Sequence, residues 1–234
     1  MKNKMLKITV LFLLFLSGSL KSQTVQILKD SVLFESNYYV LEEIKFKADK
    51  SKFVDNMYNE IQDAFDIFNK PAFHSPEKRI QAKKDTLLAL ISNDELRHAN
   101  YGFEHYEIFY DKNQLLNFST HLQSYGSPFE ATRYFCFDLN TGKNIGLDLF
   151  TNKTALLKCI KSKLKNQNEK LVPTLKALQD FKIMTNAQNK ITGITFIVTD
   201  SESYRNSGYE QFEVIFTWKE IQKYIAAPFK KRII

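Results

Sequence analysis

Cysteine is scarce in this chain, which contains only Cys136 and Cys159, and this excludes the disulfide-rich scaffold of small secreted proteins. The two cysteines could form one disulfide bond or remain as two free thiols. A disulfide bond needs Cα atoms within about 7 Å, and the sequence does not show this distance, so both interpretations stay open. The seven glycines and five prolines are too few for a long flexible linker. No internal repeat or low-complexity segment is present.

Catalytic signatures are absent as well. The sequence has no nucleophile elbow, no Cys–His site, no metal-ligand spacing and no glycine-rich phosphate loop. We therefore predict a protein that is not an enzyme and that uses no cofactor and no metal. The alternative is an envelope hydrolase or metal-dependent enzyme that uses a cluster of His105, His121 and Glu107, with Glu104 and Asp138 nearby.

The only long apolar run lies at the N-terminus. Lys2, Lys4 and Lys7 precede the apolar residues 8–16, and small polar residues follow as far as Ser22. This order is typical of a secretory signal peptide, and the run is shorter than the about 20 residues that a membrane span needs. We predict cleavage near Ser22 and a secreted or periplasmic protein with no transmembrane segment after cleavage.

The positive charge is partly a property of this leader. The formal net charge of +7 includes four lysines within residues 1–22, so the remaining chain has 29 basic and 26 acidic residues, or +3. A nucleic-acid-binding domain is expected to keep a concentrated basic face. We predict no nucleic-acid partner and interpret the lysines of 158–170 and 230–232 as solvated surface.

Residues 23–94 are predicted to form a smaller α+β subdomain before the main domain, 95–234. Alternating apolar residues predict two or three strands in 24–47, and apolar residues at helical spacing predict helices over 51–68 and 75–91. Ser75 followed by proline is the expected cap of the second helix. The predicted buried face of that helix consists of Ile80, Leu87, Leu88 and Ile91.

The segment 101–150 is predicted to be a meander of antiparallel strands. The first two strands each have apolar residues at alternating positions. The register that keeps the apolar residues of both strands on one face places Ile108 opposite Phe118, and it places His105 opposite His121 on the less apolar face. Tyr106, Ile108 and Tyr110 are then expected to share one face, and 112–114 to form a three-residue loop. The turn 138–143 should close through a positive φ angle at its glycine. In the last strand, Phe135, Phe137 and Leu139 are expected on the face opposite to Cys136.

Further along the chain, periodicity predicts helices over 151–166 and 173–181, strands over 191–198 and 209–218, and a last helix over 219–225. Hairpin-like strand connections with helices between them indicate an α+β fold. We expect an antiparallel meander sheet with helices packed on one face, where they bury Ile108 and Phe118.

The meander resembles the RsiV-like extracellular domain, a family of otherwise uncharacterised function. The resemblance covers roughly residues 95–225, and its most specific part is the motif F-D-L-x-T-G-K at 137–143. Members of the family occur at the outer end of a lysozyme-sensing anti-sigma factor and beside PdaC-type peptidoglycan deacetylase domains. The resemblance implies an exported fold and a partner in the cell envelope, either an envelope protein or peptidoglycan.

Two segments depart from the family pattern. Gly126-Ser127-Pro128 occupies the place of a Gly-Gly-Ala-His loop, and 201–208 replaces a segment containing Pro-Tyr. Aromatic residues with an arginine on polar loops are typical of recognition patches, although loop aromatics can also pack on their own sheet. The predicted binding residues are Tyr125, Phe129, Tyr204 and Arg205. We therefore expect a non-enzymatic binding or sensing domain, with peptidoglycan or a lysozyme-like protein as the candidate ligand.

Overall fold

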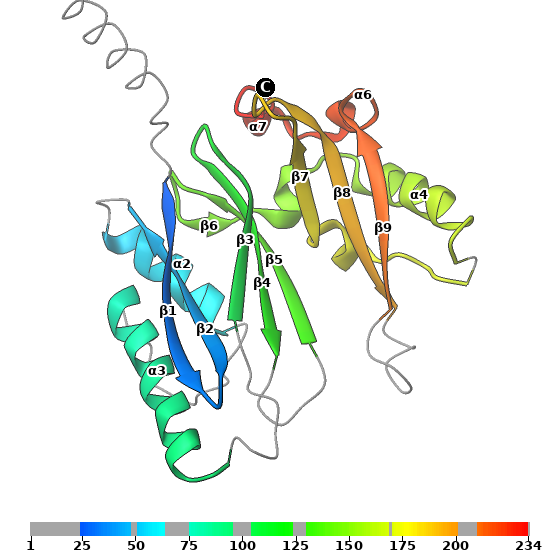
Figure 1. The fold of residues 1–234 in the computed structure, drawn as a ribbon. Coiled ribbons are helices and arrows are strands. Elements are labelled where there is room, and N and C mark those ends of the chain that lie inside the picture. The colour runs from blue at the N-terminus through cyan, green and yellow to red at the C-terminus, as the bar shows by residue number, and fades with distance from the viewer. Residues whose placement is uncertain are drawn as a thin grey trace, which may run out of the picture.

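The structure, a computed structural model, describes residues 24–47, 51–63, 75–95, 104–123, 130–168, 170–200 and 210–233. Three antiparallel sheets follow one another along the chain, and Figure 1 shows them side by side with helices around them. The predicted α+β class is confirmed. No helix within the described ranges is long and apolar enough to cross a membrane.

The strands of the three sheets are β1 (Val25–Phe34) and β2 (Asn37–Phe46), then β3 (Glu104–Lys112), β4 (Leu115–Gln123), β5 (Glu130–Asp138) and β6 (Lys143–Asn144), and finally β7 (Phe181–Thr185), β8 (Ile191–Asp200) and β9 (Glu210–Thr217). The α-helices are α2 (Ser51–Asp63), α3 (Pro76–Ser92), α4 (Lys153–Leu164), α6 (Trp218–Ile221) and α7 (Ala227–Lys230). Short 3-10 turns are η3 (Gly146–Leu149), η4 (Leu175–Leu178) and η5 (Gln222–Tyr224).

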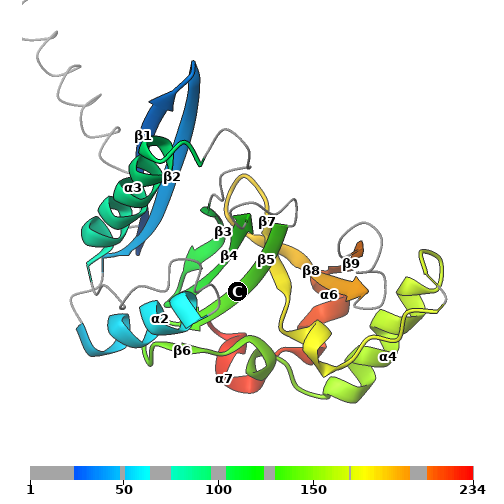
Figure 2. The ribbon, with the colours of Figure 1, turned by 90° about the horizontal axis from the view of Figure 1, so that it is seen from below.

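Helix α3 packs on the β1–β2 hairpin, and Figures 1 and 2 both show the two elements side by side. The predicted cap is confirmed, since the Ser75 hydroxyl accepts a hydrogen bond from the Lys78 amide. The predicted buried face is only partly right: Leu87 is fully buried, but Leu88 is 42% exposed. Arg79 and Lys83 are buried on this helix instead, where their charges are paired as described below.

The register of the meander is confirmed for Ile108 with Phe118 and for His105 with His121. A β-bulge at Phe109 then shifts the pairing by one residue. The predicted loop 112–114 is therefore wrong, because the bulge absorbs the odd residue and leaves a two-residue turn at 113–114. For the same reason Tyr110 points into a different core from Ile108.

Two large hydrophobic cores lie on opposite faces of the meander. Phe118, Phe135 and Phe137 stack on one another beneath α2 and the base of the β1–β2 hairpin. On the other face, Cys136 belongs to a core that the third sheet and α4 complete. We expected the helix over 151–166 to cover Phe118; α4 instead buries its apolar stripe in this second core. The predicted buried residues of α4 are Leu156, Ile160 and Leu164, and all three are fully buried.

Asn117 links the meander to the third sheet. Its side-chain amide donates to the carbonyls of Phe135 and Phe181 at 2.9 and 3.1 Å and accepts from the Ile183 amide at 2.7 Å. Strand β7 was not predicted, because 173–181 was interpreted as a helix; the structure has only the turn η4 there, followed by β7. The Asn117 side chain thus satisfies the edge of β7 that does not pair with β8.

The motif turn at 138–143 closes as predicted, with Gly142 at φ +68°. A Cβ atom on Gly142 would lie 2.8 Å from the Phe53 Cβ and carbonyl oxygen, so the glycine also permits the approach of α2. The Asp138 carboxylate accepts from the Asn140 amide at 3.0 Å and from the Arg232 guanidinium at 2.7 Å. The turn therefore connects α2, the meander and the end of the chain.

Both cysteines are free in the structure, which answers the question that the sequence left open. Cys136 is fully buried, and this burial raises the pKa of its thiol to about 12. The Cys159 sulfur lies 3.3 Å from the Tyr224 hydroxyl oxygen.

Candidate functional site

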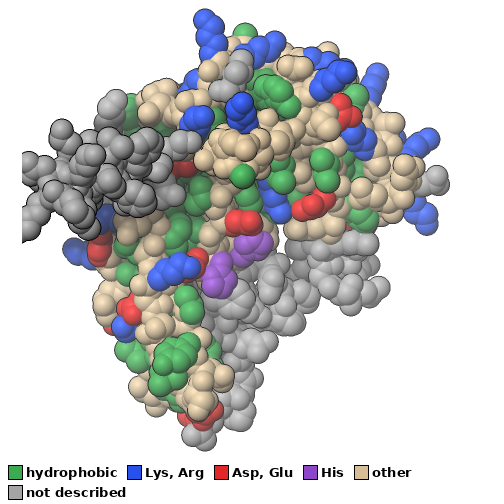
Figure 3. Space-filling model, turned by 45° about the horizontal axis from the view of Figure 1, so that its top comes forward, with side chains coloured by type: hydrophobic (Ala, Val, Ile, Leu, Met, Phe, Trp, Pro, Cys, Tyr) green, Lys and Arg blue, Asp and Glu red, His purple; other side chains and the backbone are tan. Residues whose placement is uncertain are grey.

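The face of the meander opposite to the α2 core becomes polar beyond Asn117. Glu107, Ser119 and Tyr134 lie opposite one another on β3, β4 and β5, and the next row holds the histidine pair. Figure 3 views this face and shows the two described histidines beside acidic side chains. The third sheet borders it and contributes further charged groups. We call this surface the polar face; it consists of His105, Glu107, Phe109, Ser119, His121, Tyr134, Asp180, Lys182 and Glu213.

Two aromatic rings stack at the centre of the polar face. The bulge brings Phe109 to this side, where its ring centroid lies 6.3 Å from that of Tyr134. The Lys182 ammonium lies 5.6 Å from the centroid of Phe109 and forms an ion pair with Glu213 at 3.2 Å. The Ser119 hydroxyl is fully buried on the same face and has no hydrogen-bond partner among the described residues.

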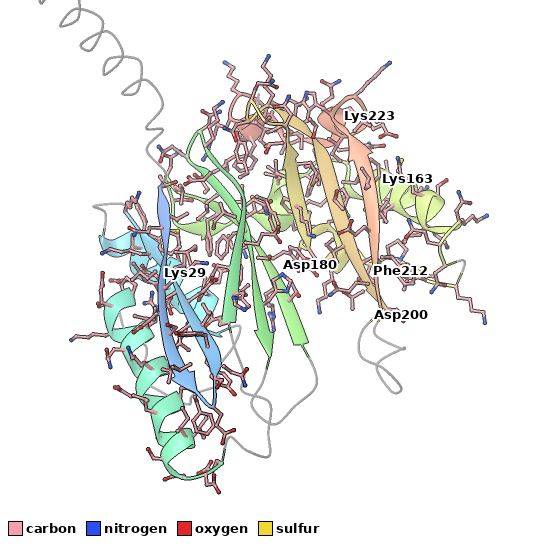
Figure 4. All side chains as sticks on the ribbon, in the orientation of Figure 1. Lys29, Lys163, Asp180, Asp200, Phe212 and Lys223 are labelled. Atoms are coloured by element: carbon pink, nitrogen blue, oxygen red, sulfur yellow. The ribbon has the colours of Figure 1, made fainter. Side chains whose placement is uncertain are left out.

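Asp180 is the most unusual group on the polar face. Its backbone carbonyl accepts from the Ile197 amide at 2.8 Å, but its carboxylate makes no hydrogen bond or ion pair with any residue in the described ranges. Burial raises the pKa of this carboxyl to about 6, against the opposing attraction of Lys176 and Arg133. Figure 4 labels Asp180 in the space between the meander and the third sheet.

Tyr134 lies among carboxylates from three separate elements. Its pKa is raised first by burial of the ring and then by the negative charges of Asp180, Glu213 and Glu107. The hydroxyl therefore stays protonated and is available as a hydrogen-bond donor. A half-buried carboxylate beside a neutral tyrosine and an aromatic pair can recognise a ligand that carries N–H or O–H groups.

The histidine pair was predicted to lie across two strands with Glu107 diagonal to His121, and the register places them so. The Nδ1 atom of His121 lies 2.9 Å from the Thr132 hydroxyl, and that of His105 lies 3.5 Å from a Glu42 carboxylate oxygen. Across the seven described ranges, no group of three or more His, Cys, Asp or Glu side chains is placed to hold a metal ion.

A second charged cluster lies where β2, α3 and β3 meet. Glu43 pairs with Arg79 and Lys83, each at 2.9 Å, and Lys83 also pairs with Glu104. Lys83 donates to the carbonyl of Glu42 at 2.7 Å as well. Because these buried charges are matched with one another, the cluster fastens the hairpin and α3 to the meander and leaves no group for a ligand. Arg79 and Lys83 are four residues apart and therefore lie on one face of α3. The sequence prediction considered only apolar residues and did not use this spacing.

The predicted binding residues Tyr125, Phe129, Tyr204 and Arg205 lie outside the described residues, as do the predicted leader and the end of the first helix beyond residue 63. The strands that precede and follow them are described. The end of β4 and the start of β5 lie at the same end of the molecule as the end of β8 and the start of β9 (Figure 1), and the polar face lies toward that end.

Sequence reasoning missed Asp180, Lys182, Phe109 and Tyr134 as candidate site residues. The alternation in F-K-I-M-T at 181–185 was a signal for strand β7, which carries Lys182 to this face. No sequence pattern showed that β7 would lie against Asn117 of the meander.

The chain was compared with known proteins. No protein-family profile and no curated protein matches the chain. Two solved structures are similar to it, one from Bacteroides fragilis and one from Pseudomonas aeruginosa. The first has a TM-score of 0.49 and 15% identity over 91% of this chain and 98% of that one. The second has a TM-score of 0.46 and 12% identity over 88% of this chain and 96% of that one. Both are DUF3298 family proteins.

Proposed function

We propose that this protein is an exported, non-enzymatic binding or sensing domain of the cell envelope and that the polar face is part of its binding surface. The leader-like N-terminus supports export. The resemblance of the meander to the RsiV-like extracellular domain supports an envelope partner, with peptidoglycan or a lysozyme-like protein as the ligand. The residues predicted from the sequence to bind, Tyr125, Phe129, Tyr204 and Arg205, lie outside the described residues and stay candidates for this binding surface.

The observation that carries this proposal is the carboxylate of Asp180. A half-buried carboxylate is normally paired, since leaving it without donors costs free energy. Its pKa of about 6 reflects that cost. A ligand that donates N–H or O–H groups to Asp180 while it packs on Phe109 and Tyr134 removes the cost on binding. Amino sugars, peptide amides and basic protein side chains all carry such donors.

The test is capture of envelope components by the purified mature protein. Wild type is expected to retain peptidoglycan fragments or a lysozyme-like protein, and Asp180→Asn and Tyr134→Phe are each expected to weaken retention at least about tenfold, through loss of one charge-assisted or one neutral hydrogen bond. The control is Asp85→Asn, which removes the same charge from α3, where Asp85 is exposed. Equal retention by Asp180→Asn and wild type would place the binding surface elsewhere.

A second pair of variants addresses the loops. Tyr125→Ala with Tyr204→Ala is expected to abolish capture with an unchanged melting curve. A fall in melting temperature would instead mean that these rings pack in the core, and full capture would exclude them from the site.

The enzyme alternative has its own test. We expect the purified protein to contain no stoichiometric zinc, and the double variant His105→Ala, His121→Ala to keep its melting temperature. Zinc at one equivalent that disappears in the double variant would support a metal-dependent activity at the histidine pair.

A further inference from the structure

Charge is distributed unevenly along the chain. Residues 23–142 contain 13 Lys and Arg against 18 Asp and Glu, whereas residues 143–234 contain 16 against 8. The net charges of these two parts are therefore −5 and +8. Such asymmetry is typical of a protein with a charged partner on one side.

Much of the excess positive charge is carried by helix α4 and by the C-terminal elements. Helix α4 and the C-terminal elements are in contact, because Lys163 pairs with Glu220 at 2.9 Å and Cys159 lies beside Tyr224. Figure 4 shows Lys163 and Lys223 on the same flank, away from Asp180. We define the basic face by the exposed lysines of these elements, namely Lys158, Lys161, Lys165, Lys219, Lys223, Lys230 and Lys231.

Most of these charges are not neutralised within the molecule. Lys158, Lys161 and Lys165 recur at helical spacing on the side of α4 opposite to its buried stripe. In the part of the chain that the structure describes, neither they nor the lysines 219, 230 and 231 have an acidic side chain at ion-pair distance. Seven exposed like charges repel one another, so a partner that supplies negative charge gains free energy at this face.

The shape and composition of the surroundings favour a lipid surface over a small anion. Figure 3 shows lysines and arginines projecting from a rounded rim of the molecule rather than lining a hollow. The segment 170–176 follows α4 in the chain. It contains the exposed apolar residues Val172 and Leu175, whose exposed fractions are 61% and 51%, between Lys170 and Lys176. Its turn η4 contacts α4. Lysines with exposed apolar side chains beside them are the composition of surfaces that dock on anionic bilayers.

We propose that the basic face docks the protein on a membrane surface that carries anionic phospholipid headgroups. This second function is distinct from ligand recognition by the polar face and does not depend on it. Asp180 of the polar face lies away from Lys163 and Lys223 (Figure 4), so docking by α4 and the C-terminal elements leaves this carboxylate open to a ligand.

The experiment measures binding of the purified mature protein to vesicles by co-sedimentation. Vesicles of phosphatidylcholine with about 30% phosphatidylglycerol are expected to bind the protein, pure phosphatidylcholine vesicles are not, and raising salt from about 0.1 to about 0.5 M should release it. Each lysine near an anionic surface contributes roughly fivefold in affinity, so Lys158→Gln, Lys161→Gln, Lys165→Gln is expected to bind at least about tenfold more weakly.

Two further variants complete the design. Lys78→Glu with Ala89→Glu makes the same charge change on exposed positions of α3 and should bind vesicles as wild type does. Val172→Ser with Leu175→Ser should weaken vesicle binding but not binding to soluble inorganic polyphosphate. Equal binding to both vesicle types, an equal loss in the α3 variant, or binding to polyphosphate without binding to vesicles would each overturn the proposal. Melting curves of all variants exclude loss of folding as the cause.

Discussion

Replacing Asp180 with asparagine is expected to stabilise the protein at neutral pH. The carboxylate of Asp180 is half-buried and has no hydrogen-bond donor among the described residues, so its ionised form is disfavoured in the folded chain. Asparagine has nearly the same shape and does not ionise, so the folded variant avoids this cost. A gain in stability at a position that we propose to bind ligand is the trade-off expected of a functional site.

The magnitude follows from the pKa. Folding raises the pKa of Asp180 from the ordinary value of 3.8 to about 6, mainly through burial. At 1.36 kcal/mol per pKa unit, the difference corresponds to at most about 3 kcal/mol, and partial exposure of the group reduces this to about 1–3 kcal/mol. The Asp180 carboxyl group lowers the free energy of unfolding when it is ionised. The cost is therefore absent below the unfolded pKa, grows as pH rises from about 4 to about 6, and is complete above that.

The assay is chemical denaturation of wild type and Asp180→Asn between pH 4 and pH 8, with the difference in unfolding free energy plotted against pH. We expect no difference near pH 4 and a plateau of about 1–3 kcal/mol in favour of the variant above pH 6, or about 2–10 °C in melting temperature. The subtraction removes the contributions of all other titrating groups. A variant that is equally or less stable at pH 7 would refute the reasoning, because it would mean that the carboxylate is stabilised by a partner.

The remaining predictions concern the framework. Asn117→Leu removes three buried hydrogen bonds to two strands and should cost about 2–4 kcal/mol in urea denaturation; a cost below about 1 kcal/mol would mean that the sheets do not depend on it. Gly142→Val should cost at least about 2 kcal/mol through its positive φ angle and its contact with α2, while Lys143→Ala should be near neutral, and equal melting temperatures would contradict this. Arg232→Ala removes the hydrogen bonds of the guanidinium to Asp138 and to the carbonyls of Asn113 and Gln114 and should cost about 1.5–3 kcal/mol, with an unchanged melting curve as the contrary result.

The elements of the fold could largely be predicted because their signals are local. Ser75 followed by proline determines where α3 begins, and the apolar spacing of Leu156, Ile160 and Leu164 determines which face of α4 is buried. The register of Ile108 with Phe118 follows from keeping two apolar sets on one face. Each of these signals lies within one helix or one hairpin, so no knowledge of the tertiary structure is needed.

The errors have physical causes in packing. Ile108, Phe109 and Tyr110 are three consecutive apolar residues, so alternation alone does not show which one bulges and which core each enters. On α3, a count of apolar residues places Leu88 inside, but the carboxylate of Glu43 makes burial of Arg79 and Lys83 favourable. Contacts between segments that are distant in sequence determine which of these residues are buried and where. The sequence of a single segment does not show such contacts.

The candidate site was predictable only in part for the same reason. His105, His121 and Glu107 were identified because they lie on adjacent strands of one hairpin. Lys182 reaches the polar face from strand β7, and Asp180 from the residue before it, more than 40 residues beyond the end of β5, and the Asn117 side chain holds that strand in place. The burial of Asn117 within β4, which makes this link necessary, is known only from the structure.

The motif F-D-L-x-T-G-K, the most specific part of the resemblance, has a structural role in this chain. The Asp138 carboxylate accepts hydrogen bonds from its own turn and from Arg232. Gly142 has no side chain, so Phe53 of α2 can pack closely against the turn. Each of these interactions holds together parts of the chain that are distant in sequence, and none involves the polar face. In this chain the motif therefore contributes to folding. The ligand of this chain must therefore be inferred from other residues, and Asp180 and Tyr134 are the candidates, because burial raises the pKa of both groups.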